Sequence, residues 1–171
     1  FKAVAGAEQA LHLDEVASLL ASGALVIDAC RRGLRAGAAW LPLARRPVLF
    51  ALARALAEAW PGDVNRETLI AHAFRTRRPD ETHRARLRVE IGRLRRELRP
   101  LAEIEATAGG FRLVTRGAVR LLLPPIETPD GTVLALLADG EAWSTSALAL
   151  ALGSSQRTVQ RALQSLQDAG Q

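Results

Sequence analysis

The sequence has no methionine and only one cysteine, Cys30, in 171 residues. A single cysteine excludes a disulfide within the chain and is compatible with a reducing compartment, so we expect Cys30 to be a buried thiol. Lysine is nearly absent as well, because Lys2 is the one lysine among 23 basic residues. Since the chain starts with Phe1 and has no methionine, we expect it to be a piece of a longer protein.

Long apolar runs are also missing. None approaches the roughly 20 residues that a membrane helix needs, and the first ten residues do not have a basic segment followed by a hydrophobic one. We therefore expect a cytoplasmic protein that does not bind membranes. Its 49% of hydrophobic residues is enough to bury a core in one large domain or two small ones.

Groups that would indicate catalysis are scarce. The histidines His12, His72 and His83 are scattered without metal-ligand spacing, and no second cysteine or carboxylate cluster accompanies them. Gly109 and Gly110 are not followed by a helix with Lys-Ser or Lys-Thr, so they do not form a phosphate loop. The sequence predicts no catalytic site, no metal and no cofactor, and therefore not an enzyme.

Positive charge is concentrated in one segment. Residues 75–99 contain ten arginines and four acids, a net charge of +6 that exceeds the +5 of the whole chain. Residues 126–171 contain two arginines and five acids, a net charge of −3. The basic segment therefore favours a negatively charged partner, whereas the C-terminal part does not.

The order of predicted elements indicates a mainly α protein with small β-sheets, of the α+β class. Residues 7–23 have apolar residues at helical spacing, and two strand-like segments, 24–30 and 38–44, flank a turn-rich stretch. Pro47 suits the first turn of a helix that extends to Trp60.

Two further helices and a hairpin follow. Asn65 can cap a helix over 66–74, and Asp80 or Thr82 can cap the arginine-rich helix that ends at residue 98. Residues 104–114 have β-prone arms around Gly109 and Gly110, which is typical of a hairpin. A sheet, three helices and a terminal hairpin together predict a winged helix.

The arginine-rich helix, 82–98, has two distinct sides at about 100° per residue. One side is an apolar stripe: Leu87, Ile91, Leu94 and Leu98. The opposite stripe contains no acid: Thr82, Arg86, Val89, Arg93 and Arg96. Nearer the apolar flanks are Arg84, Arg88 and Arg95, whose long stems would leave the guanidinium groups able to reach phosphates. The ordinary alternative is a solvated surface of an arginine-rich protein, but an α-helix with arginines fits the DNA major groove.

These segments resemble the OmpR/PhoB-type winged-helix DNA-binding domain of bacterial response regulators over about residues 24–115. The resemblance is carried by "PGDVNRETL", by "IGRLRREL" and by the Gly-Gly-Phe-Arg end of the hairpin. It implies that the arginine-rich helix enters the major groove, with these residues near base edges: Arg86, Arg88, Val89 and Arg93. It also implies Arg95 at the DNA backbone and the hairpin at the minor groove. The family often has a basic residue at the hairpin tip, where this sequence has Thr107 and Ala108, and Arg112 is a weaker substitute.

A second unit is predicted after a proline-rich break. Three helices, over 132–140, 144–153 and 154–170, would form a helix-turn-helix pattern. Its predicted core is Leu148, Leu152, Val159, Leu163 and Leu166, and the residues predicted to point away from it are Arg157, Gln160, Arg161 and Gln164. The segment resembles bacterial winged helix-turn-helix repressors at "LALALGSSQRTVQRALQSL". Because the chain ends where a wing would begin, we expect this unit to be incomplete. With its negative charge, use in packing or partner contact is an equal alternative to DNA binding.

The sequence thus predicts tandem winged helix-turn-helix units: an N-terminal helix and linker (1–23), a winged-helix domain (24–116), a linker (117–127) and a second helix-turn-helix domain (128–171). The favoured hypothesis is a bacterial transcription regulator that binds specific double-stranded DNA. A second copy of the chain and the transcription machinery are further candidate partners. The alternative hypothesis is a protein-interaction scaffold in which the arginines bind an acidic partner.

Overall fold

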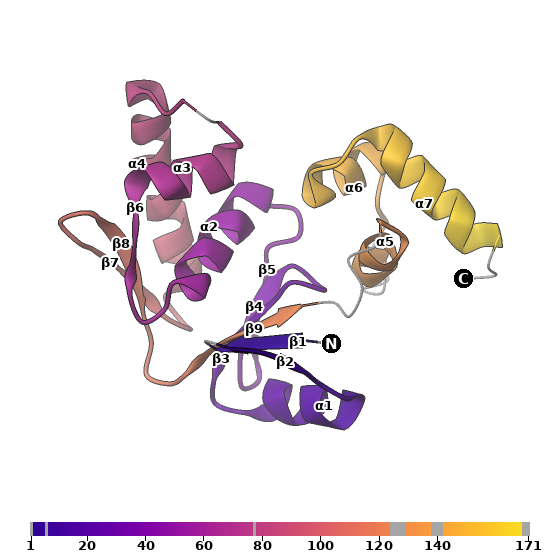
Figure 1. The fold of residues 1–171 in the computed structure, drawn as a ribbon, viewed down its shortest axis with the longest axis horizontal. Coiled ribbons are helices and arrows are strands. Elements are labelled where there is room, and N and C mark those ends of the chain that lie inside the picture. Colours follow the sequence, from indigo (N-terminus) through magenta and orange to yellow (C-terminus); the bar gives the residue numbers. More distant parts are fainter. Residues whose placement is uncertain (1, 6, 77, 124–128, 138–141, 169–171) are drawn as a thin grey trace.

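The computed structural model describes residues 2–5, 7–76, 78–123, 129–137 and 142–168, and the chain is a mixed α+β protein (Figure 1). A six-stranded sheet has the order β2-β1-β9-β3-β4-β5. Its strands are β1 Lys2–Ala5, β2 Ala7–Ala10, β3 Leu25–Asp28, β4 Gly33–Ala36, β5 Ala39–Pro42 and β9 Val119–Leu123. All neighbouring strands are antiparallel except β3 and β9, which are parallel.

The two central strands are buried on both faces of this sheet, which explains their nearly continuous apolar sequences. On β3, Leu25 and Ile27 contact the main core, whereas Val26 packs with helix α1, Leu13–Ala21, on the other face. On β9, Leu121 and Leu122 are divided between the same two clusters. Figure 1 shows α1 on one side of the sheet and the longer helices on the other.

Two predictions for the segments that flank the predicted winged-helix domain were wrong. Residues 7–10 are strand β2 rather than the start of a helix, and α1 begins only at Leu13, where Glu15 accepts a hydrogen bond from the His12 amide at 2.8 Å. Residues 119–123, predicted to belong to a linker, are strand β9. Residues 7–10 pair with β1, directly before them in sequence, whereas residues 119–123 pair with β1 and β3, which are distant in sequence. The turn-rich stretch 31–37 likewise contains strand β4.

Three helices and a small sheet make up the next part: α2 Pro47–Glu58, α3 Arg66–Phe74, α4 Glu81–Leu98, and the strands β6 Asp63–Asn65, β7 Glu103–Ala106 and β8 Gly110–Val114. The predicted caps are confirmed, because Asn65 accepts from the Thr68 amide at 2.8 Å and Asp80 accepts from the His83 amide at 2.9 Å. Asp80, not Thr82, therefore caps α4. The predicted hairpin is β7–β8, and a Cβ at Gly110 would collide with the β6 backbone at Val64.

The C-terminal part contains α5 Pro129–Leu137, α6 Thr145–Leu152 and α7 Gln156–Asp168. Ser144 and Ser155 cap α6 and α7, and Gly153 ends α6 with a left-handed φ of 61°. The predicted helix 132–140 is α5, which begins three residues earlier, and residues 138–140 lie outside the described residues. Of the predicted core residues, Leu148 and Val159 are fully buried, and Leu152, Leu163 and Leu166 are partly buried against them. The prediction missed Val133 and Leu136 of α5, which are also buried in this cluster.

This C-terminal part also contacts the rest of the chain. Ala44, from the loop between β5 and α2, joins its hydrophobic cluster. The Arg45 guanidinium lies 5.2 Å from the centre of the Trp143 ring. In the part of the chain that the structure describes, no helix has the length and apolar character needed to cross a membrane.

Candidate nucleic-acid interface

Helix α4 is oriented by its apolar stripe. Leu87, Ile91, Leu94 and Leu98 are at most 1% exposed and join the main core. The predicted opposite stripe is exposed, and Val89 at its centre keeps 53% of its surface in contact with solvent. Because the fold buries none of these side chains, this face of α4 is accessible to a partner.

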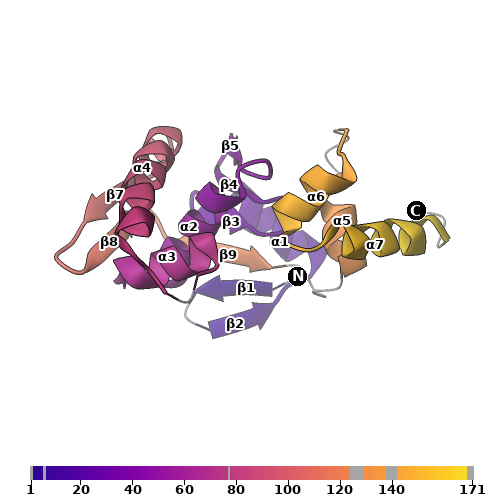
Figure 2. The same cartoon turned by 90° about the horizontal axis from the view of Figure 1, so that it is seen from above.

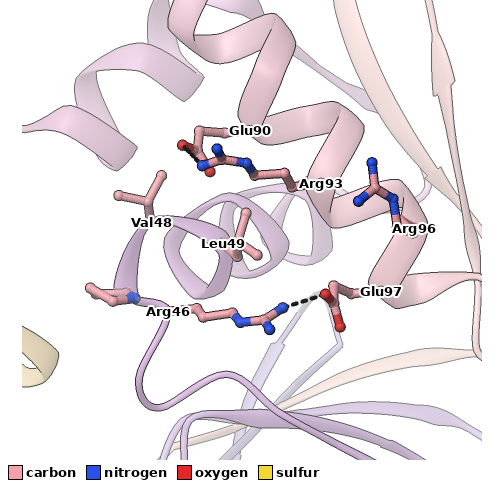
Figure 3. A pocket seen from close by; sticks show the side chains of 8 residues that line it. Arg46, Val48, Leu49, Glu90, Arg93, Arg96 and Glu97 are labelled. Carbon is pink, nitrogen blue, oxygen red and sulfur yellow. Dashed lines mark hydrogen bonds and ion pairs between the residues drawn. The ribbon is translucent and has the colours of Figure 1, made fainter.

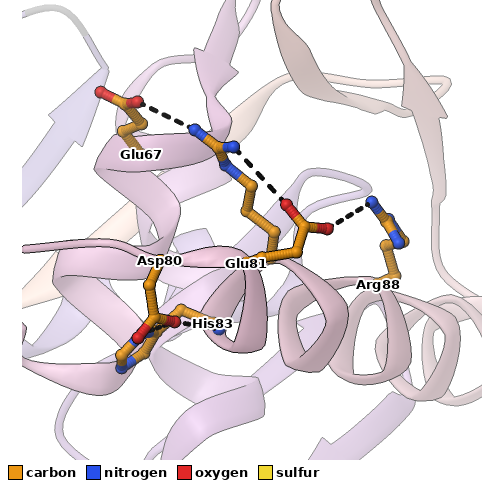
Figure 4. Close-up of polar contacts among 6 residues, drawn as sticks. Glu67, Asp80, Glu81, His83 and Arg88 are labelled. Atoms are coloured by element: carbon orange, nitrogen blue, oxygen red, sulfur yellow. Dashed lines mark hydrogen bonds and ion pairs between the residues drawn. The ribbon is translucent and has the colours of Figure 1, made fainter.

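The first turn of α4 contains ion pairs that the helical wheel did not predict (Figure 4). Glu81 pairs with Arg84 at 3.5 Å and with Arg88 at 3.3 Å, and Glu67 on α3 approaches Arg84 at 3.6 Å. The Asp80 carboxylate forms hydrogen bonds with the backbone amide and the ring of His83, and these hydrogen bonds lower the pKa of Asp80. Arg84 and Arg88 thus have carboxylate partners, although both remain exposed.

A groove of about 450 Å³ lies between the C-terminal half of α4 and the start of α2 (Figure 3). Arg93 and Arg96 line one side, and Arg46 and Pro47 line the other. Arg93 pairs with Glu90 at 2.9 Å, and Arg46 pairs with Glu97. Since α2 starts at this groove, its positive helix end adds to the local potential. Sequence reasoning missed Arg46; the signal was two adjacent arginines directly before the Pro47 helix start.

Arg86 and the hairpin are positioned by aromatic rings. The Arg86 guanidinium lies 4.5 Å from the centre of the Phe74 ring on α3, which holds this exposed side chain in place. Arg95 donates from Nε to the Ile104 carbonyl at 2.8 Å and lies 5.7 Å from the Phe111 ring. The structure therefore joins Arg95 to the hairpin rather than presenting it only to solvent.

Arg66 is a second residue that sequence reasoning missed. From the start of α3 it donates to the carbonyls of Ala108 at 3.1 Å and Thr107 at 3.3 Å. Its guanidinium also lies 5.4 Å from the centre of the Phe111 ring, the same hairpin ring that Arg95 of α4 approaches. Arg66 and Arg95 together connect α3 and α4 to the β7–β8 hairpin.

The predicted hairpin contacts are occupied within the protein. Thr107 donates from Oγ1 to Asp63 at 2.6 Å and accepts from the Gly110 amide at 2.9 Å, so its hydroxyl shapes the turn. Arg112 donates twice to Glu105, at 2.9 and 2.6 Å. Because Arg66 also bonds the Thr107 and Ala108 carbonyls, the hairpin offers the exposed Ala108 and Gly109 more readily than either side chain.

The predicted contact residues of the second unit do not join the α4 site. Arg157, Gln160, Arg161 and Gln164 are all exposed on α7, and Gln164 donates to Asp168 at 2.9 Å. Both views place α7 at the opposite end of the molecule from α4 and the hairpin (Figures 1 and 2). Any shared partner would have to extend along the molecule.

Outside this interface, the cysteine and the possible metal ligands are groups that could form a second kind of site. Cys30 is buried, and burial together with Asp28 raises the pKa of its thiol to about 12, which keeps it protonated and weakly nucleophilic. Within the described residues, histidine, cysteine and carboxylate side chains form no cluster of three or more that could hold a metal ion. No protein-family model, curated protein or solved structure matches the chain.

Proposed function

We propose that this chain binds specific double-stranded DNA through α4, as the DNA-binding part of a transcription regulator. On this proposal α2–α4 and the β7–β8 hairpin form a winged helix, and α5–α7 form a second helix-turn-helix unit. The observation that carries it is the exposed, acid-free stripe of α4, with Val89 at its centre. A helix face of this kind can enter the major groove.

The side chains of the stripe have chemistry suited to base edges. Arg86 and Arg93 lie on either side of Val89 in sequence, and arginine can donate two parallel hydrogen bonds to guanine O6 and N7. The methyl groups of Val89 can contact a thymine methyl. Because Phe74 already holds Arg86, less side-chain entropy is lost when that residue binds.

Phosphates would be bound beside the groove. Arg96 and Arg46 lie on its two sides, and the amino end of α2 contributes a positive helix terminus. Binding requires Arg46 and Arg93 to exchange Glu97 and Glu90 for DNA atoms. Exposed ion pairs are worth about 0–1 kcal/mol, so this exchange has a small cost.

The hairpin would act mainly through its exposed tip. Thr107 and Arg112 already have protein partners, whereas Ala108 is exposed at the tip. We therefore assign the hairpin a positioning role at the adjacent DNA backbone, with Arg66 and Arg95 fixing its angle to α4.

The test is a selection of bound sequences from a pool of random duplex DNA. The proposal predicts enrichment of a short motif that contains guanine, and loss of that enrichment in Arg93→Ala. Arg99→Ala is the matched control, because Arg99 is exposed just after α4 and does not line the groove. A wild-type pool that remains random, together with tight binding to an acidic protein, would support the scaffold alternative instead.

A further inference from the structure

A second cleft, of about 740 Å³, lies between the α2–α3 part and the end of α6. Its volume is in the range of small-molecule sites. Five basic residues line it: Arg32, Arg54, His72, Arg75 and Arg86. None of the described residues that line this cleft is acidic.

Among these side chains, Arg32 has a buried nitrogen atom without a hydrogen-bond partner. It is half-buried, its Nη1 donates to the Ala151 carbonyl, and its Nε is shielded from solvent without a hydrogen-bond partner. Burial, and then repulsion from Arg54 and Arg75, lower the pKa of Arg32 to about 10. A buried donor without an acceptor costs free energy. An anion in the cleft would supply a charge opposite to those of Arg32, Arg54 and Arg75.

The neighbouring arginines have few opposing charges. Arg75 donates from Nη1 to the Gly153 carbonyl at 2.5 Å, at the negative end of α6. Arg54 pairs with Glu58 at 2.7 Å, and Glu58 does not line the cleft. Arg32 and Arg75 are also the two non-glycine residues with positive φ, 52° and 54°, in the described part of the chain. Left-handed backbone at both positions places these two side chains in one cleft at a cost in strain.

The walls between the arginines are apolar. The cleft is lined by Phe50, Phe74, Val48 and Leu150. The Arg32 guanidinium lies 5.8 Å from the centre of the Phe50 ring. We propose that this cleft binds a small organic phosphate, with the phosphate among Arg32, Arg54 and Arg75 and an apolar group against the phenylalanine rings. This site goes beyond the proposed DNA interface, with which it shares Arg86, the Phe74 ring beside it, and Pro47 and Val48 at the start of α2.

Phenyl phosphate is a suitable probe, because it combines an aromatic ring with a phosphate. Calorimetric titration of the full chain should show one site, with phenol and inorganic phosphate each at least tenfold weaker. Arg75→Gln and Arg54→Gln should each weaken phenyl phosphate binding at least tenfold, and Arg99→Gln should leave it unchanged. Arg54→Gln keeps both arginine contacts to α6, so it tests the site even where Arg75→Gln unfolds or moves α6.

Three outcomes would overturn the inference: no binding of phenyl phosphate, equal affinity for phenol or inorganic phosphate, or unchanged affinity in Arg54→Gln. Duplex DNA binding is measured on the same samples, and Arg54→Gln should leave it unchanged. A loss of DNA affinity in that variant would assign the cleft to DNA phosphates and overturn the small-molecule site. If the wild type binds phenyl phosphate but no DNA, the proposed function fails while this inference stands.

Discussion

Helices α4 and α7 are both capped, amphipathic helices, but their exposed faces differ in charge and in neighbouring elements. Each begins at a capping side chain, Asp80 or Ser155, and each buries one face in a hydrophobic cluster. The outward face of α4 has three arginines and adjoins Arg46 and the start of α2, whereas α7 has two arginines among glutamines in a segment of net charge −3. Amphipathic pattern thus determines which face is exposed, and neighbouring elements and charge determine what that face can bind.

The largest expected effects are those of cavity-creating substitutions in the main hydrophobic core and in the core of α5–α7. Leu94→Ala should lower the free energy of unfolding by about 2–5 kcal/mol, because Leu94 is fully buried on the core-facing side of α4, and DNA binding should be lost with it. Leu148→Ala should be similarly destabilising for α5–α7 while DNA affinity falls little. Denaturant unfolding and mobility-shift titration of both variants check this contrast. Equal losses of DNA affinity would mean that the two parts do not act separately.

Arg93→Ala tests base recognition by α4. It should weaken binding to a selected site by about 1–3 kcal/mol and affect random DNA less, because a lost guanine contact matters only where guanine is present. Affinities for both duplexes, with Arg99→Ala alongside, provide the measurement. Equal losses on both duplexes would remove Arg93 from base recognition.

Arg96→Ala and Arg95→Ala separate phosphate contact from hairpin anchoring. Arg96→Ala should make the plot of log affinity against log salt shallower by about one unit, as expected for one lost phosphate contact. Arg95→Ala should leave that slope nearly unchanged and lower stability, because Arg95 is bonded to the Ile104 carbonyl. The reverse pattern would return Arg95 to the phosphate role that the family resemblance implies.

The smallest effect is expected at α7. Replacing Arg157 and Arg161 with alanine should leave affinity for short DNA unchanged and reduce discrimination on a longer site, since a linked weak module adds specificity through high effective concentration. Footprinting compares this variant, the wild type and residues 1–123. Equal protected lengths and equal discrimination would assign α5–α7 to dimerisation or partner contact.

The features that the sequence predicted are mostly local. The buried stripe around Leu87 and the caps at Asn65 and Asp80 depend on spacings of three or four residues, which a sequence displays directly. Strand β9 could not be predicted in this way, because its identity depends on pairing with β3 and β1, both about a hundred residues earlier.

The candidate interface was predicted only in part, because some of its features are local and others depend on tertiary contacts. The exposed stripe of α4 follows from helical geometry, but the Arg46–Glu97 pair joins residues 51 positions apart. Likewise, the contacts of Arg66 with the hairpin tip depend on how α3 and the hairpin pack together. Such pairings require the tertiary structure, and they changed the expected roles of Arg95, Thr107 and Arg112.

The most direct measurement is the affinity of the wild-type chain for duplex DNA between about 50 and 200 mM salt, with poly-glutamate as competitor. If the arginine face of α4 binds DNA, affinity should fall steeply with salt, and unlabelled duplex should compete far better than poly-glutamate. The steep dependence should weaken when Arg93 and Arg96 are both replaced with alanine. Equal competition by poly-glutamate, or an unchanged salt dependence in the double variant, would contradict DNA binding by this face.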